Sequence, residues 1–168
     1  MDLSLAIDSV NTQVNNNFKP LNASQLNWKP EPNKWSIGQC LDHIMVTNRT
    51  YFPTFNKIFE GSHRLSFLQR INPFKKSFRP MMVKSLGPQP TRKFVAPGNF
   101  APSSSGIAAD IVEQFNNHQQ EVKLYFSRLQ QKDTSGIVIA SPVSSIITYS
   151  LSDALKIIAG HEQRHVNQ

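Results

Sequence analysis

The chain has 168 residues, a net charge of +7 and one cysteine. This length is typical of one domain, so we expect residues 1–168 to fold as a unit. No apolar run is long enough to span a membrane, and the N-terminus lacks the basic start of a signal peptide. The single cysteine, Cys40, excludes an intramolecular disulfide, which favours a cytoplasmic location.

The positive charge is concentrated in one segment. Residues 61–109 contain eight basic residues and no acidic one, whereas the rest of the chain is close to neutral. A solvated loop is the simpler interpretation, and attraction of an acidic small molecule by Arg79, Arg92 or Lys93 is the functional one. The prolines of this segment prevent a single recognition helix, so we expect no nucleic-acid partner.

Hydrophobic periodicity predicts two helices in the first third of the chain. The first would cover residues 3–14, where apolar residues recur at spacings of four, three and four: Leu3, Ile7, Val10 and Val14. A proline-rich connection follows. The second helix would start at Ser36, which forms a capping box with Gln39, and Pro53 would kink or interrupt it.

The rest of the sequence predicts two more helices, which makes the expected fold class all-α. Residues 61–106 are expected to form an irregular crossover, with a short turn near residues 64–71. A third helix would run from about Gly106 to Lys132, and residues 133–150 would be irregular or partly extended. The last helix would begin at Ser150 or Ser152 as its cap. The crossover of about 45 residues would allow the second and third helices of a four-helix bundle to run parallel.

Three histidines are candidate metal ligands. His161 and His165 are four residues apart, so they lie on one face of the last helix, on its apolar side. Buried imidazoles need partners for their nitrogens, and a metal ion would provide one. If the second and last helices are neighbours, His43 completes a three-histidine site of the kind that leaves a position open for water or substrate.

Other polar residues near these positions have simpler interpretations. His118 is expected to be a satisfied core histidine and His63 to be exposed. Cys40 is expected to be a small buried residue rather than a ligand. The remaining candidates for orienting or proton-handling roles are Asp42, Glu162 and Gln168, of which Asp42 and Glu162 are expected to be ordinary exposed helix positions.

Three stretches resemble the DinB-like (YfiT-like) superfamily. They are "KWSIGQCLDHI", "RKFVAPGNFAP" and the closing "TYSLSDALKIIAGHEQRHVNQ". The resemblance covers nearly the whole chain and implies a four-helix bundle in up-down-down-up order. It also implies His43, His161 and His165 as ligands of a divalent metal ion, zinc or nickel most readily, and a homodimer.

The same resemblance implies a small-molecule substrate, with a low-molecular-weight thiol as one option. Our leading hypothesis is an enzyme, a hydrolase or thiol S-transferase, in which the metal activates a water or thiol. The alternative is a non-catalytic metal- or ligand-binding stress-response module. A third hypothesis, a nucleic-acid-binding bundle, would show affinity that falls steeply with salt.

Overall fold

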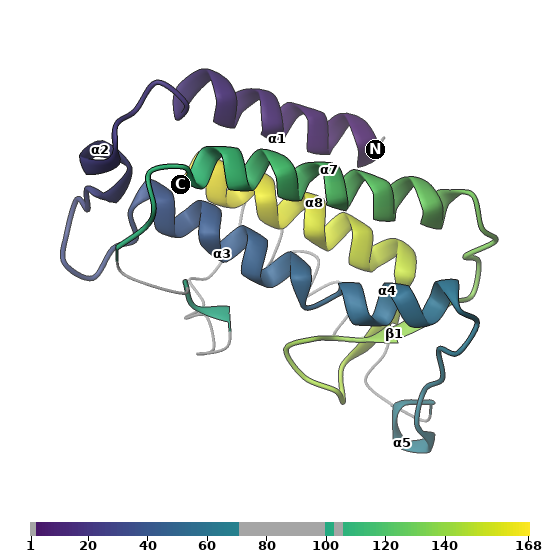
Figure 1. Cartoon of the computed structure of the whole chain (residues 1–168). Helices are drawn as coiled ribbons and strands as arrows, with labels where there is room; N and C mark the ends of the chain where they lie inside the picture. The colour runs from purple at the N-terminus through teal and green to yellow at the C-terminus, as the bar shows by residue number, and fades with distance from the viewer. Residues whose placement is uncertain (1–2, 71–99, 103–105) are drawn as a thin grey trace.

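The computed structural model describes residues 3–70, 100–102 and 106–168, and over these the chain is mostly helical (Figure 1). This confirms the all-α class. None of the helices in the described ranges is long and apolar enough to cross a membrane. The elements are α1 (Leu3–Asn17), α2 (Ala23–Asn27), α3 (Ile37–Arg49), α4 (Phe52–Phe59), α5 (Phe67–Arg70), α7 (Ile111–Gln130), β1 (Val138–Ala140), β2 (Thr148–Ser150) and α8 (Leu151–Asn167).

The four longest helices pack side by side. Helices α7 and α8 lie between α1 and α3, and each of them contacts both (Figure 1). Helix α4 contacts α7, and α2 contacts α3. The arrangement brings the last helix of the chain against α3, which is the neighbour relation that a joint site for His43 and the two C-terminal histidines requires.

The predicted second helix is two helices. Ser36 caps α3, and the Ser36–Gln39 capping box is present as predicted. Helix α3 ends at Arg49, and α4 begins at Phe52 with Pro53 in its first turn. Proline is tolerated there because the first helical N–H groups have no partner within the helix, so the interruption has a local cause.

The third predicted helix starts later than expected, at Ile111 rather than Gly106. The reason is tertiary. The Asn27 side chain accepts a hydrogen bond from the Ile107 N–H at 2.7 Å and donates one to the Ile107 carbonyl at 2.8 Å. These two bonds tie residue 107 to the end of α2 and keep it out of the helical ladder.

Two smaller elements refine the predicted connections. Helix α2 was not predicted, although its Asn22–Gln25 capping box is visible in the sequence. The segment after α7 is partly extended, as expected, because β1 pairs antiparallel with β2 and Ile139 faces Tyr149. Ser150 ends the hairpin and caps α8, since its Oγ accepts from the Asp153 N–H at 3.0 Å.

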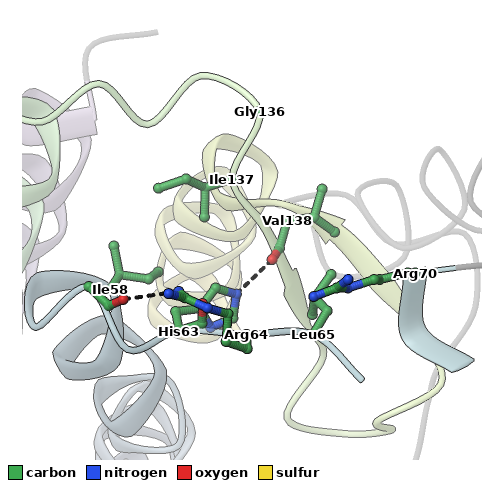
Figure 2. Close-up of a pocket in the computed structure, with 9 residues that line it drawn as sticks. Ile58, His63, Arg64, Leu65, Arg70, Gly136, Ile137 and Val138 are labelled. Atoms are coloured by element: carbon green, nitrogen blue, oxygen red, sulfur yellow. Dashed lines mark hydrogen bonds between the residues drawn. The ribbon is translucent and has the colours of Figure 1, made fainter. Parts of the chain in front are cut away.

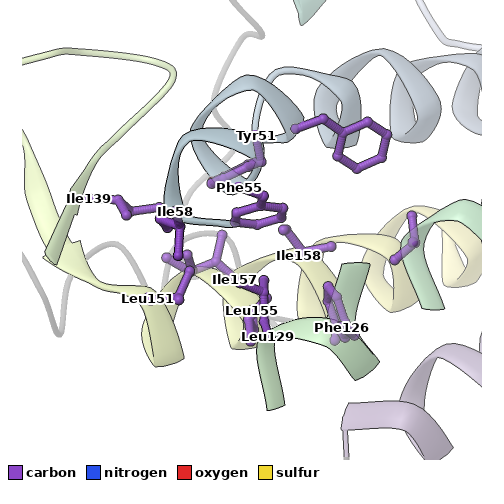
Figure 3. Packing of buried hydrophobic residues seen from close by; sticks show 14 of the residues in the cluster. Tyr51, Phe55, Ile58, Phe126, Leu129, Ile139, Leu151, Leu155, Ile157 and Ile158 are labelled. Atoms are coloured by element: carbon purple, nitrogen blue, oxygen red, sulfur yellow. The ribbon is translucent and has the colours of Figure 1, made fainter. Parts of the chain in front are cut away.

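The buried apolar side chains form two clusters. The first packs α4, the C-terminal half of α7, the hairpin and the first half of α8 around Phe55 (Figure 3). The second packs α1, α2 and α3 against the start of α7 around Phe115. The candidate histidines belong to neither cluster.

Candidate metal centre

The structure brings His43, His161 and His165 together. Each offers one ring nitrogen, and these three atoms lie within 4.8 Å of one another. The ring centroids are 5.0 Å apart for His43 and His161, 4.6 Å for His43 and His165, and 4.5 Å for His161 and His165. All three side chains are buried. Two helices that are distant in sequence therefore deliver three imidazoles to one point.

His43 is oriented by a backbone carbonyl. Its Nδ1 donates to the carbonyl oxygen of Phe100, which accepts only, so the Nε2 is left as a bare acceptor. That Nε2 lies 3.2 Å from the Nε2 of His161. Two nitrogens bound to one tetrahedral zinc ion are about 3.3 Å apart, given metal–nitrogen bonds of about 2.0–2.1 Å. The spacing of this pair of nitrogens fits a shared ion.

Burial keeps the three imidazoles in the neutral form that binds metals. It lowers the pKa of His165 from 6.5 to about 3, the pKa of His161 well below 6.5 and that of His43 below 6.5. The Arg164 guanidinium adds to the lowering in each case. The Nδ1 atoms of His161 and His165 are buried without a hydrogen-bond partner. Neutral imidazole is the form in which histidine binds a metal ion.

The Trp35 indole lies against the cluster. Its ring centroid is 4.7 Å from that of His43 and 5.9 Å from that of His165, the latter in a stacked arrangement. Trp35 is half-buried and directly precedes the cap of α3. It forms one wall of the cluster.

Four of the other candidate residues lie outside the three-histidine cluster. Cys40 is buried, as expected, and is not among the clustered groups; burial raises the pKa of its thiol to about 11. The expectation that Asp42 and Glu162 are exposed was wrong. Asp42 is 8% exposed and Glu162 is 0% exposed. Gln168, at the C-cap of α8, is exposed, and its side chain raises the pKa of His165 against the larger lowering by burial.

Glu162 belongs to a buried polar group that the sequence did not reveal. The Asn48 Nδ2 donates to the Glu162 Oε1 at 2.6 Å and lies 3.2 Å from the Nε2 of His118. His118 is thus a core histidine, as predicted, but only its Nε2 has a hydrogen-bond partner, because its Nδ1 is buried without one. Gln119, next to it, is fully buried. Asn48 lies among the apolar positions of α3. A polar side chain at such a position is the feature of the sequence that could have indicated this buried group.

His63 lies at a separate pocket. It is half-buried rather than exposed, and its Nε2 donates to the Val138 carbonyl at 2.9 Å (Figure 2). The pocket has a volume of about 430 Å³ and lies between the end of α4, α5 and β1. None of the three clustered histidines lines it. Arg79, Arg92 and Lys93 lie outside the described residues.

Comparison with known proteins identifies the family. A family model described as the DinB superfamily matches residues 6–168, nearly the whole chain. The chain therefore belongs to the DinB superfamily. No curated protein and no solved structure matches it significantly.

Proposed function

We propose that the protein is a divalent-metal-dependent enzyme that acts on a small molecule, with His43, His161 and His165 as the metal ligands. The observation that carries the proposal is the convergence of three buried imidazole nitrogens within 4.8 Å. Membership of the DinB superfamily supports it. We further propose the up-down-down-up bundle order and the homodimer that the family resemblance implies.

A zinc or nickel ion held there would lower the pKa of a bound water or thiol, which gives a hydrolase or a thiol S-transferase. The chain's own residues have distinct tasks. The Phe100 carbonyl holds the His43 ring with its Nε2 toward the other two histidines. Trp35 shields one side of the cluster, and its half-exposed ring offers an apolar surface to a small molecule.

The first experiment is a metal analysis of protein purified without a histidine tag, by mass spectrometry. We expect about one equivalent of a divalent ion per chain in the wild type and loss of that ion in His43→Ala. His63→Ala is the matched control, because this histidine lies at the separate pocket. Hydrolysis and thiol-transfer assays of the loaded protein follow. No metal in the wild type, and no uptake of supplied zinc or nickel, would contradict the proposal.

The assays also separate the enzyme from the alternative. A protein that binds one ion through the three histidines but turns over no ester, amide or thiol acceptor would be a metal-binding module. Activity that depends on the ion and is lost in His43→Ala would exclude the module.

A further inference from the structure

The two hydrophobic clusters are separated by a layer of polar side chains. On α7, residues of one cluster precede His118 and Gln119, and residues of the other follow them. On α3, Asn48 follows residues of the cluster around Phe115. Tyr51, just beyond the end of α3, belongs to the cluster around Phe55. The layer consists of Asn48, His118, Gln119 and Glu162, each at most 3% exposed.

One amide joins three helices in this layer. The Asn48 side chain, from α3, donates to Glu162 on α8 and faces the Nε2 of His118 on α7. Burial lowers the pKa of His118 to about 4, so the ring is neutral and its Nε2 accepts the second N–H of the amide. Both N–H groups of Asn48 are therefore used, one on each neighbouring helix.

This bond lies close to the histidine cluster on both helices. Asn48 follows His43 by five residues on α3, which is about 7.5 Å along the helix axis. Glu162 directly follows His161 on α8. Apolar contacts lack direction and tolerate a slip of one helix along another, whereas a slip here would take the Asn48 donor from a buried carboxyl group. A single buried asparagine fixes register in coiled coils for the same reason.

We propose that Asn48 is a positioning residue: through Glu162 it sets the axial register of α3 against α8 and thereby places His43 beside His161 and His165. This inference rests on the proposed function, because its first measurement is the affinity for zinc. A second measurement on the metal-free protein is independent of that function.

The test compares two double variants with the wild type. Asn48→Leu with Glu162→Met replaces both partners of the register bond by apolar groups, and it also takes the donor from the His118 Nε2. Asn48→Asp with Glu162→Gln exchanges acceptor and donor and keeps a bond between α3 and α8, and the neutral His118 can donate to the new carboxylate by carrying its proton on Nε2. We measure the zinc dissociation constant by competition with a chromophoric chelator, and the midpoint of urea unfolding. Tyr51→Phe is the control. It breaks the hydrogen bond between the buried hydroxyls of Tyr51 and Tyr149, which are 2.9 Å apart and belong to the hydrophobic cluster around Phe55.

We expect the apolar double variant to fold, with a urea midpoint lowered only by the lost His118 donor, and to bind zinc about tenfold or more weakly. The exchanged variant should bind within about threefold of the wild type, as should Tyr51→Phe. Wild-type zinc affinity in the folded apolar variant would overturn the proposal. If that variant does not fold, a folded exchanged variant with tenfold weaker binding would also overturn it.

The metal-free readout is the set of nuclear Overhauser contacts between the imidazole protons of His43 and those of His161 and His165. We expect these contacts in the wild type and the exchanged variant, and their loss in the apolar variant. Contacts that persist in the apolar variant would overturn the positioning role. A wild type that shows the contacts but takes up no metal would contradict the proposed function and leave the positioning role supported.

Discussion

His43 shows how a single side chain is prepared for its role by its neighbours. The Phe100 carbonyl fixes the ring through Nδ1, Trp35 packs against one face, and burial lowers the imidazole pKa. The hydrogen bond directs Nε2 at His161, and burial favours the neutral ring even though the bond to Phe100 by itself raises the pKa. The orientation is therefore set before any ion binds, which reduces the free-energy cost of assembling the site.

Trp35 should report metal binding. It is the tryptophan beside the cluster, whereas the other one, Trp28, is 65% exposed. Nickel quenches a nearby indole, so we expect a nickel titration to lower the tryptophan fluorescence of the wild type. Trp35→Phe should abolish the decrease, and Trp28→Phe should preserve it. Equal quenching in both variants would place the ion elsewhere.

Because the pKa of buried His118 is lowered, we expect the protein to lose stability in acid. Its pKa is about 4 in the folded protein and 6.5 in the unfolded chain, because burial disfavours the charged ring. The unfolded chain therefore binds the extra proton first, and the stability present above pH 6.5 is lost as the pH falls toward 4. Between pH 7 and pH 4.5 the free energy of unfolding should fall by about 2–3 kcal/mol because of this residue.

Replacing His118 isolates its contribution to the loss of stability in acid. His118→Gln keeps a neutral acceptor for the Asn48 amide and does not titrate. Urea unfolding at pH 7 and pH 4.5 should show a smaller acid loss in the variant than in the wild type, by about 2–3 kcal/mol. Equal acid losses in the two proteins would mean that the ring is already charged in the folded state.

At the scale of elements, α8 depends on its N-terminal cap. The Ser150 Oγ accepts from the Asp153 N–H and donates to the Asp153 carboxylate at 2.7 Å. Ser150→Ala should lower the free energy of unfolding by about 1 kcal/mol. Ser152→Ala, at an exposed position of the same first turn, should leave it nearly unchanged. Chemical denaturation distinguishes the two, and equal effects would argue against the cap.

The start of α3 depends on a glycine. A Cβ on Gly38 would lie 2.9 Å from the Ile107 Cβ, so the helix can approach residue 107 only without a side chain. Gly38→Ala gains about 1 kcal/mol of helix propensity but must displace Ile107, at a cost of about 1–3 kcal/mol. We expect net destabilisation in thermal unfolding. Gly106→Ala, where nothing lies within 4 Å of the added atom, is the control and should not destabilise.

For the whole molecule, metal binding should appear as added stability. An ion that binds only the folded state, at a hundredfold excess over its dissociation constant, contributes about 2.7 kcal/mol. For a chain of this size that raises the melting temperature by about 5–10 °C. Calorimetry with and without zinc should show this rise in the wild type and not in His43→Ala. An equal rise in both would point to binding outside the three histidines.

Local signals predicted much of the fold. Three signals act within a few residues, so the sequence shows them directly: the spacing of apolar residues in α1, the Ser36–Gln39 box of α3 and Pro53 in the first turn of α4. The start of α7 could not be predicted in this way. It depends on Asn27 bonding the backbone of a residue 80 positions away, and periodicity carries no information about such a contact.

The sequence by itself determined the helical class, the family and the shared helix face of His161 and His165, because these follow from spacing along the chain. Only the tertiary structure decided that Glu162 is buried rather than exposed and that Asn48 meets it. It also placed the Phe100 carbonyl on His43. The physical reason is that burial and hydrogen-bond partners depend on which helices become neighbours. That choice is made by the packing of the whole core rather than by any one segment.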